Sequence, residues 1–335
     1  MGIKTIISHI NTVRELAFQL EMRVNTLVYY SINDQSRFYS QFDINKKTGG
    51  TRTISAPNKS LKEIQRRIYK LLVQLYAPSE AAFGGVRKRH IRSNALRHKD
   101  SLWILRIDLE DFYGTITRNR VFGLLRKLGF ETLPAAILSN LTTLNGVLPQ
   151  GAPTSPVLAN MVCRKLDTEM TKYAQRYGLR YTRYFDDLVF SAPVRSRTTF
   201  PPESRQVRPE GIPRLDPYGF RRIVEQQGFK LNENKTRFKR RRIAQYVTGV
   251  KINENPNVSR PYIRNVRAIL HDWEVNGYKK AQERFEQVTG STSPLKQVIR
   301  GRIEHIGFVR SSENPKEDEI YLKLRLRLAG LKTTT

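Results

Sequence analysis

Three aspartates carry the clearest chemical signal in the sequence. Asp108 lies near the end of a segment that alternates apolar and polar residues, and Asp186 and Asp187 are neighbours between two short apolar segments. An Asp pair in a turn is usually only a turn former. Carboxylates at adjacent strand ends, however, are the ligands that two Mg²⁺ ions about 3.5–4 Å apart require. We therefore expect Asp108, Asp186 and Asp187 to bind metal and to be catalytic.

The overall charge suggests the class of partner. The chain has 335 residues with 59 Lys and Arg against 30 Asp and Glu, which gives a formal net charge of +29. Such a field attracts polyanions, above all nucleic acid, although solubility or a purely structural, phosphate-neutralising role would also fit. Three acidic groups held together in so basic a chain favour bound cations, because cations relieve their mutual repulsion.

The periodicity of the sequence indicates which elements position the aspartates. Residues 102–109 alternate, so they predict a half-buried strand whose polar face carries Arg106 and Asp108. Residues 179–184 and 188–191 predict two strands joined at a tip that contains Asp186 and Asp187.

Helices are expected on both sides of this strand region. Residues 58–76 have apolar residues at helical spacing with basic residues on the other face. Ser155 can cap a helix that begins at Pro156 and runs to Gly178. Residues 193–217 predict a long loop, and the chain from residue 253 onward predicts a separate basic helical region.

Cysteine content and hydropathy bear on the compartment. Cys163 is the single cysteine, which excludes a disulfide framework and a cysteine-based zinc site. No apolar run approaches the roughly 20 residues of a membrane helix, and the first residues do not resemble a secretory signal. We expect a cytoplasmic protein without a membrane partner.

Four segments resemble the palm motifs of the reverse transcriptase family, in the family's order. They are IDLEDFYGTI, LPQGAPTSPVLAN, RYFDD and GFKLNENKT. The resemblance implies an α+β right-hand polymerase with fingers, a palm with an antiparallel sheet and a helical thumb. It implies fingers and an N-terminal helical region at residues 1–100, a palm at 101–252 with finger elements near 115–150, and a basic thumb at 253–335.

The resemblance also assigns roles to individual residues. Two Mg²⁺ ions held by Asp108, Asp186 and, with less certainty, Asp187 would activate the primer hydroxyl and stabilise the leaving pyrophosphate. Tyr113 would lie under the sugar of a deoxynucleoside triphosphate and exclude a 2′-hydroxyl, although a core tyrosine beside Phe112 is the alternative. The expected nucleotide-binding residues are Arg52, Leu109, Glu110, Asp111, Phe112, Tyr113 and Gln150.

Lys235 begins a basic run that has two interpretations. The family carries a lysine in this segment that protonates the pyrophosphate. Six of the eight residues from 235 to 242 are basic, so the run could equally be a track for RNA phosphates.

Two short strings point to the bacterial retron branch of the family. NALRH at residues 94–98 resembles its Asn-Ala-x-x-His motif, and VTG at residues 247–249 resembles its Val-Thr-Gly motif, although a helix start and a strand end are the alternatives. The residues assigned to RNA binding are Asn94, His98, Lys235, Arg237, Lys239, Arg240, Arg241, Arg242, Val247, Thr248 and Gly249.

The retron resemblance implies a particular reaction and particular partners. The enzyme would bind a cognate non-coding RNA (msr-msd), start DNA synthesis from a guanosine 2′-hydroxyl and make branched RNA-linked single-stranded DNA (msDNA). Such systems often act in anti-phage defence with a separate effector protein. Two features depart from the branch: Phe185 stands where most of its members have alanine, and the loop at residues 193–217 is longer than usual.

Three alternatives remain open at this point. One is a non-retron bacterial reverse transcriptase, of the group II intron-like or abortive-infection type. Another is an RNA-binding protein that keeps the polymerase shape without catalysis, which the intact Asp108, Asp186, Asp187, Gln150 and Tyr113 disfavour. An RNA-dependent RNA polymerase is the third, and Tyr113 speaks against it.

Overall fold

Strand β3 (Ser101–Leu109) carries Asp108 and lies in a four-stranded sheet with the order β4-β5-β3-β6. Trp103, Leu105, Ile107 and Leu109 are buried, whereas Arg106 and Asp108 are partly exposed. The alternation therefore predicted both the strand and the face that carries its polar residues.

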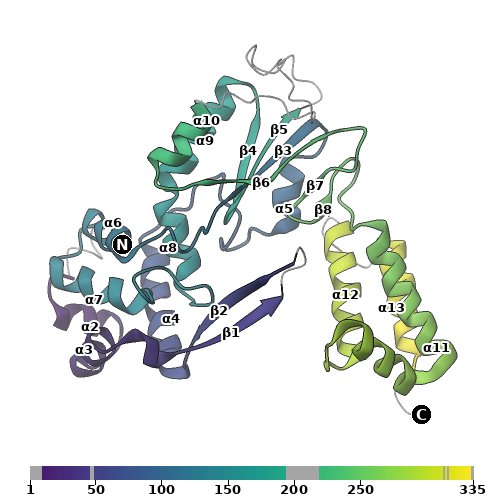
Figure 1. Cartoon of the computed structure of the whole chain (residues 1–335), viewed down its shortest axis with the longest axis horizontal. Helices are drawn as coiled ribbons and strands as arrows, with labels where there is room; N and C mark the ends of the chain where they lie inside the picture. The colour runs from purple at the N-terminus through teal and green to yellow at the C-terminus, as the bar shows by residue number, and fades with distance from the viewer. Residues whose placement is uncertain (1–9, 46–48, 194–218, 312–313, 315–316, 333–335) are drawn as a thin grey trace. The chain divides into compact units, whose positions relative to one another are not determined.

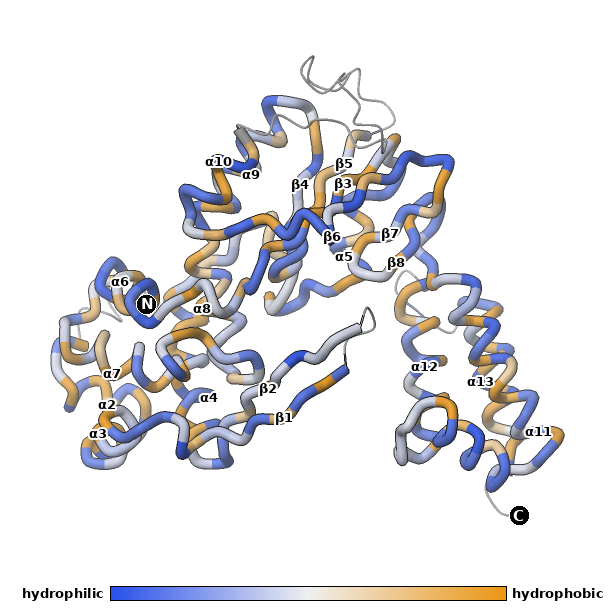
Figure 2. The backbone as a smooth tube through the Cα atoms, viewed as in Figure 1, coloured by the Kyte–Doolittle hydropathy of each residue, from blue (hydrophilic) through white to orange (hydrophobic). Residues whose placement is uncertain are grey.

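Strands β4 (Arg180–Tyr184) and β5 (Asp187–Pro193) are consecutive and joined by a two-residue turn of Phe185 and Asp186. The predicted hairpin is confirmed. β5 is almost wholly buried, because Leu188, Val189 and Phe190 form a continuous apolar run. The other edge strand, β6 (Leu231–Arg240), is predominantly hydrophilic, as its colour in Figure 2 shows.

Helices cover this sheet and extend beyond it (Figure 1). Helix α9 (Arg164–Arg176) packs on β4, and α10 (Gly219–Gln226) packs on α9. Helix α8 (Ser155–Val162) contacts α4 (Lys59–Gln74) and α6 (Arg118–Leu128), and α7 (Thr132–Thr142) contacts α3 (Val24–Ile32). Helix α2 (Val13–Gln19) and the 3₁₀ helix η1 (Gln35–Phe38) complete the N-terminal part.

The helix expected at residues 58–76 is confirmed as α4. Asn58 caps it, since its side-chain oxygen accepts a hydrogen bond from the Leu61 amide at 2.9 Å. β1 (Tyr39–Asn45) and β2 (Thr51–Pro57), which precede α4, form an antiparallel pair in which Tyr39 lies opposite Pro57.

The prediction of a single helix from Pro156 to Gly178, capped by Ser155, is wrong. Two helices, α8 and α9, are separated by Cys163, which forms a turn between them with φ −75° and ψ −1°. The N-cap position belongs to Thr154, and Ser155 is the first helical residue. The Ser155 hydroxyl donates instead to the Pro149 carbonyl at 2.7 Å, so it fixes the preceding loop and is not available as a cap.

The computed structural model describes residues 10–45, 49–193, 219–311, 314 and 317–332. The expected loop at 193–217 lies outside these residues, apart from Pro193. Within them, two compact units are distinguished. The first holds residues up to 89, 105–190 and 219–238, and the second holds 90–104, 191–193 and the chain from 239 onward.

The second unit is mainly helical, as the sequence predicts. It contains α5 (Ile91–Arg97), the strand pair β7 (Tyr246–Val247) and β8 (Val250–Lys251), and the helices α11 (Arg260–Thr289), α12 (Leu295–Arg310) and α13 (Glu319–Gly330). α11 is kinked at Gly277, whose φ of 81° is non-helical.

The α+β class is thus confirmed, while the division at residues 100 and 252 stays a prediction. In the part of the chain that the structure describes, no helix is long and apolar enough to span a membrane.

Candidate active site

The end of β3 and the β4–β5 turn bring Asp108 and Asp186 to one place. The Leu109 amide donates a hydrogen bond to the Asp186 carbonyl at 2.9 Å, so the residue after Asp108 is paired with the turn itself. Both aspartates line a cavity of about 860 Å³ in the first unit. This is the meeting of carboxylates at adjacent strand ends that the sequence predicts.

The cavity also receives side chains from β2, from the loop before α8 and from β6. Its lining includes both carboxylates and cations. The residues that line it are Thr51, Arg52, Thr53, Ile54, Asp108, Leu109, Asp111, Phe112, Tyr113, Gln150, Gly151, Ala152, Ser155, Pro156, Phe185, Asp186, Asn232 and Lys235. Of the expected catalytic and nucleotide-binding residues, only Glu110 and Asp187 are not among them.

Negative charge is concentrated around Asp186. Burial raises the pKa of this carboxyl group, and the charges of Asp108 and Asp187 raise it further. Each added negative charge makes ionisation of its neighbour more costly. A cation placed among these groups would remove that cost, so the electrostatics favour metal binding.

Asp187 faces a different partner. Its carboxylate accepts hydrogen bonds from Arg106, at 2.8 Å from Nη2 and 3.3 Å from Nε. Burial raises the pKa of Asp187, and Arg106 acts in the opposite direction. Arg106 lies on the polar face of the strand, as expected, but the sequence pattern alone indicated no role for it. Its position two residues before Asp108, and so on the same face, was the available signal.

Lys235 lies next to the other carboxylate. Its Nζ is 2.9 Å from Oδ2 of Asp108, and the Lys235 side chain remains 52% exposed. Lys235 therefore supplies a positive charge at the position where Asp108 would bind a cation. Within the described residues, no group of three or more His, Cys, Asp or Glu side chains forms a ready-made metal site.

The loop after β3 forms one wall of the cavity. Tyr113 is half-buried, and its ring centroid lies 5.2 Å from that of Phe112 and 6.4 Å from that of Phe185. Burial raises the pKa of Tyr113, and the charge of Asp186 raises it further. Glu110 is not among the residues that line the cavity, although its amide fixes the loop by donating to the Lys230 carbonyl at 2.9 Å.

Gln150 is held against the β1–β2 pair through its backbone. Its carbonyl accepts a hydrogen bond from the Ser55 amide at 2.8 Å. Gly151 has φ +129°, and a Cβ there would lie 2.7 Å from the Ser55 carbonyl oxygen. Only glycine allows this approach, which brings Gln150 and Arg52 to the same cavity.

Asn232 is a cavity residue that was not predicted from the sequence. Asn232 lies on β6 three residues before Lys235, and both line the cavity. It is part of the quoted segment GFKLNENKT, so the motif itself was the signal.

The residues assigned to RNA binding differ in burial and in their partners; Lys235, described above, pairs with Asp108. Asn94, His98 and Val247 are fully buried in the second unit, and His98 Nδ1 lies 2.8 Å from the Ser191 hydroxyl. The basic side chains Arg237, Arg240 and Arg242 are exposed; Lys239 lies over the Tyr246 ring, Arg241 pairs with Asp100, and Thr248 and Gly249 form the β7–β8 turn.

The elements that carry the strings NALRH and VTG, far apart in sequence, contact each other. α5, which carries Asn94, packs on β7 and β8, and the Thr248 hydroxyl donates to the Ile91 carbonyl at 3.2 Å. Their buried members therefore stabilise one local structure in the second unit.

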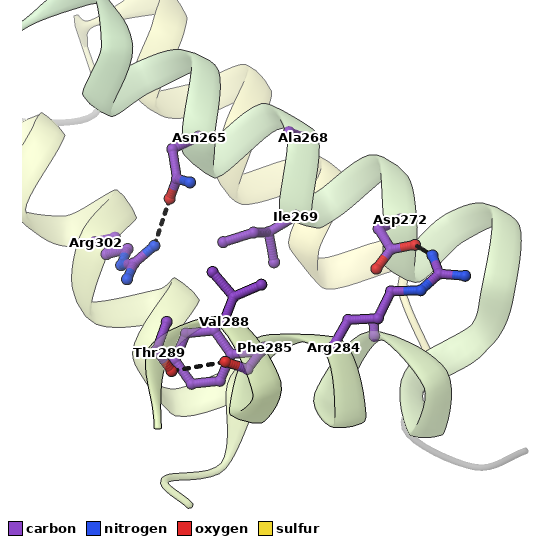
Figure 3. Close-up of a pocket in the computed structure, with 10 residues that line it drawn as sticks. Asn265, Ala268, Ile269, Asp272, Arg284, Phe285, Val288, Thr289 and Arg302 are labelled. Atoms are coloured by element: carbon purple, nitrogen blue, oxygen red, sulfur yellow. Dashed lines mark hydrogen bonds and ion pairs between the residues drawn. The ribbon is translucent and has the colours of Figure 1, made fainter. Parts of the chain in front are cut away.

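The second unit has a smaller cavity of its own, of about 280 Å³ (Figure 3). α11 contributes all of its lining except Arg302 of α12. Its polar groups bond to each other: Arg302 donates to Asn265 at 2.6 Å, and Arg284 pairs with Asp272. None of the residues predicted to be catalytic lines this cavity.

Comparison with known proteins gives a consistent family. Residues 44–252 match the family described as "Reverse transcriptase (RNA-dependent DNA polymerase)". The chain is 37% identical over 281 residues to the Retron Mx65 reverse transcriptase of Myxococcus xanthus, an alignment that covers 78% of this chain and 62% of the relative.

Two further relatives agree with this match. The Retron Mx162 reverse transcriptase of Myxococcus xanthus is 33% identical, with 85% of this chain and 63% of the relative covered. The Retron Ec86 reverse transcriptase of Escherichia coli is 31% identical, with 78% of each chain covered. The chain thus spans less than two thirds of the length of the two Myxococcus relatives.

Proposed function

Because the chain belongs to the reverse transcriptase family, and within it to the bacterial retron type, we propose that it is an RNA-directed DNA polymerase. The right-hand polymerase fold follows from this membership. The observation that carries the proposal is the meeting of Asp108 and Asp186 in a cavity that also contains Tyr113, Gln150 and Arg52.

The side chains present fit a divalent metal whose coordination is completed by substrate. Magnesium prefers oxygen ligands, retains several waters and is commonly held by one or two carboxylates together with substrate phosphates. Asp108 and Asp186 provide such carboxylates in the cavity. When bound there, two Mg²⁺ ions would activate the primer hydroxyl and stabilise the charge on the leaving pyrophosphate.

We propose that Asp187 acts indirectly, through its electrostatic effect on Asp186. Its carboxylate is bonded to Arg106, so its charge contributes to the field at Asp186 without direct access to the cavity. Lys235 pairs with Asp108 beside the cavity, and from this position its ammonium group would contact the pyrophosphate.

The other cavity residues would select and orient the nucleotide. Tyr113 presents a partly buried ring beside Asp186, where it would meet a ribose 2′-hydroxyl and so favour deoxynucleotides. Arg52 would contact the triphosphate, and Gln150 would line the base or sugar. The backbone from Leu109 to Phe112 would follow the phosphates, with Asp111 held at φ +40°.

The retron relatives support a more specific reaction. We propose that the enzyme copies part of a cognate non-coding RNA into branched, RNA-linked single-stranded DNA, starting from a guanosine 2′-hydroxyl, as part of a cytoplasmic anti-phage system with an effector protein. The exposed arginines 237, 240 and 242 are the candidates for direct RNA contact. Asn94, His98 and Val247 would act by holding the structure around α5.

The test is to express the gene with its native flanking DNA and run cellular nucleic acid on a denaturing gel before and after RNase treatment. An abundant short DNA that shifts after RNase and is absent from the Asp186→Asn strain would establish the reaction. If no such DNA is made although the purified protein extends a primer on RNA with deoxynucleotides, the chain is a polymerase that does not make msDNA.

A further inference from the structure

A cluster of buried polar side chains lies behind the β4–β5 turn. Arg183 of β4 and Asp167 of α9 are 0% exposed, and Asn160 of α8 is 1% exposed. The guanidinium donates to both carboxylate oxygens of Asp167 at 2.7 Å and to the Asn160 side-chain oxygen at 3.0 Å. The Tyr181 hydroxyl adds a bond to Asp167 at 3.1 Å, so this carboxylate is fully engaged.

Stability alone does not explain such a cluster. Removing two charges from water is costly, and apolar residues of similar volume often stabilise a protein as well or better than a buried ion pair. What apolar residues cannot supply is direction, because a guanidinium presents its five N–H donors in a fixed plane. The remaining N–H donors of Arg183 can therefore position other groups around the guanidinium.

One of them points to the turn that carries Asp186. Nη1 of Arg183 lies 3.3 Å from the Phe185 carbonyl oxygen. Phe185 has φ +56°, a left-handed conformation that residues with a side chain rarely adopt. The next carbonyl, that of Asp186, accepts from the Leu109 amide. Both carbonyls of the two-residue turn thus have assigned partners, one on each side.

The same cluster fixes the segment that packs on the turn. The Arg183 amide donates to the Ala81 carbonyl at 2.7 Å, and the Asn160 amide group donates to the Gly84 carbonyl at 2.8 Å. Gly84 is so close to the turn that a Cβ would lie 2.7 Å from the Phe185 nitrogen. The Phe185 backbone and ring are therefore closely packed against Gly84.

We propose that Arg183, oriented by Asp167 and Asn160, is a positioning residue that holds the β4–β5 turn in its left-handed conformation and so sets the place of the Asp186 carboxylate. The effect of this role on catalysis rests on the proposed polymerase function. Its effect on the conformation of the turn rests on the turn geometry alone. It also assigns a role to two motif residues that had none. Asn160 is the last residue of LPQGAPTSPVLAN, and Arg183 is the first residue of RYFDD.

Two variants separate positioning from stability. Arg183→Lys keeps a positive charge beside Asp167, but a single ammonium group lacks the planar fork that reaches Asp167, Asn160 and the Phe185 carbonyl together. The double variant Asp167→Leu with Arg183→Met removes both charges and keeps apolar volume, so no unpaired charge is left buried. If the double variant does not fold, Arg183→Lys alone decides.

The first measurement is hydrogen–deuterium exchange of the full-length protein, because it needs neither metal nor substrate. We expect the peptide containing Phe185, Asp186 and Asp187 to exchange at least about tenfold faster in both variants, as local opening of the turn becomes easier. The matched control is Arg310→Lys in α12 of the second unit, which disturbs the half-buried ion pair between Arg310 and Asp318, whose Nε and Oδ2 atoms are 2.8 Å apart. It should leave this peptide unchanged.

The second measurement is primer extension with purified protein at varied Mg²⁺ and dNTP concentrations. Loss of a residue that orients a metal ligand typically costs about 10–100-fold in metal affinity or activity. We expect kcat to fall in this range and the Mg²⁺ requirement to rise, while the KM for dNTP stays within about twofold because Tyr113, Gln150 and Arg52 are untouched.

The outcomes distinguish the two proposals. Unchanged exchange at the turn in Arg183→Lys, or a wild-type Mg²⁺ requirement and kcat in a folded variant, would overturn the positioning role and leave the polymerase function standing. If the wild-type protein extends no primer but the turn still opens in both variants and not in Arg310→Lys, the function fails and the positioning of the turn stands.

Discussion

The carboxylate in the β4–β5 turn and the carboxylate in the buried cluster behind it differ in whether the chain supplies them with a charged partner. Asp167 is fully buried and accepts three hydrogen bonds, two from Arg183 and one from Tyr181. Asp186 lines an open cavity, has no ion-pair partner within the described residues, and has a pKa raised by burial and by its acidic neighbours. One carboxylate is paired inside the chain, and the other is left for a cation from outside.

The contrast shows how a basic protein can keep an acidic site. Pairing each carboxylate with one of 59 basic residues would be easy in this chain. Arg106 and Lys235 do pair with Asp187 and Asp108, yet Asp186 is positioned by its backbone and by Arg183 acting on the neighbouring carbonyl. The hydrogen bonds thus hold the backbone of the turn, and the Asp186 carboxylate itself stays available to bind a cation.

The largest effect is expected for Asp186→Asn. Because this change removes a metal ligand in the cavity, primer extension on an RNA template should fall by at least about a thousandfold, beyond the 10–100-fold typical of an outer-shell partner. Steady-state extension assays on the purified variant measure this. Retention of more than a tenth of the wild-type rate would show that the Asp186 carboxylate is not a metal ligand that catalysis requires.

Asp167→Asn should act mainly on stability. Removing the charge leaves Arg183 buried without its ionic partner, a change that costs about 3–5 kcal/mol. Urea unfolding monitored by circular dichroism would measure the loss, with Asp272→Asn, at a pair whose arginine is exposed, as the control expected to lose no more than about 1 kcal/mol. A loss of similar size in both would mean that burial of the pair is unimportant.

Asp187→Asn sharpens the comparison within the pair of adjacent aspartates. Its carboxylate is bonded to Arg106, so extension should fall by about 10–100-fold, less than for Asp186→Asn, because an orienting charge is lost and a cavity ligand is kept. Equal losses in the two variants would place Asp187 among the direct metal ligands.

Tyr113→Ala tests an aromatic residue that lines the same cavity beside Asp186. Removal of the ring should relax discrimination against ribonucleoside triphosphates by about 10–100-fold, a range typical for loss of a steric contact in a pocket. The ratio of kcat/KM for dNTP and rNTP measures it, and Phe112→Ala serves as the comparison for general loss of packing. An unchanged ratio would show that Tyr113 does not select the sugar and only packs beside Phe112.

The smallest effect concerns stability without metal. Since the folded-state pKa of Asp186 is raised, its ionisation opposes folding, and stability is lost as pH rises through that pKa. In EDTA at neutral pH, Asp186→Asn should therefore unfold a few degrees higher than the wild type, and the difference should shrink toward acidic pH. Differential scanning calorimetry at several pH values would show it, and a lower midpoint for the variant at neutral pH contradicts the repulsion argument.

Local patterns were sufficient for the elements around the site. The alternation from Trp103 to Leu109 predicted β3 and its polar face, and the apolar spacing after Asn58 predicted α4 with its cap. Both depend on interactions between residues close in sequence, which is why one chain segment reveals them. The helix after Ser155 was predicted only in part, because the Ser155 hydroxyl is bonded to the Pro149 carbonyl and a turn at Cys163 separates α8 from α9.

The sequence by itself determined that this chain has the acidic residues, aromatic residues and ordered motifs of its family, and that Asp108 and Asp186 lie at strand ends. Only the tertiary structure decided which partner each charge has. Arg106 takes Asp187, Lys235 takes Asp108, and Arg183 joins Asp167 to the turn beside Asp186. These pairs join residues 16 to 127 positions apart, so spacing along the chain carries no record of them; burial and hydrogen-bond direction, which arise only when the elements pack, select one partner over another.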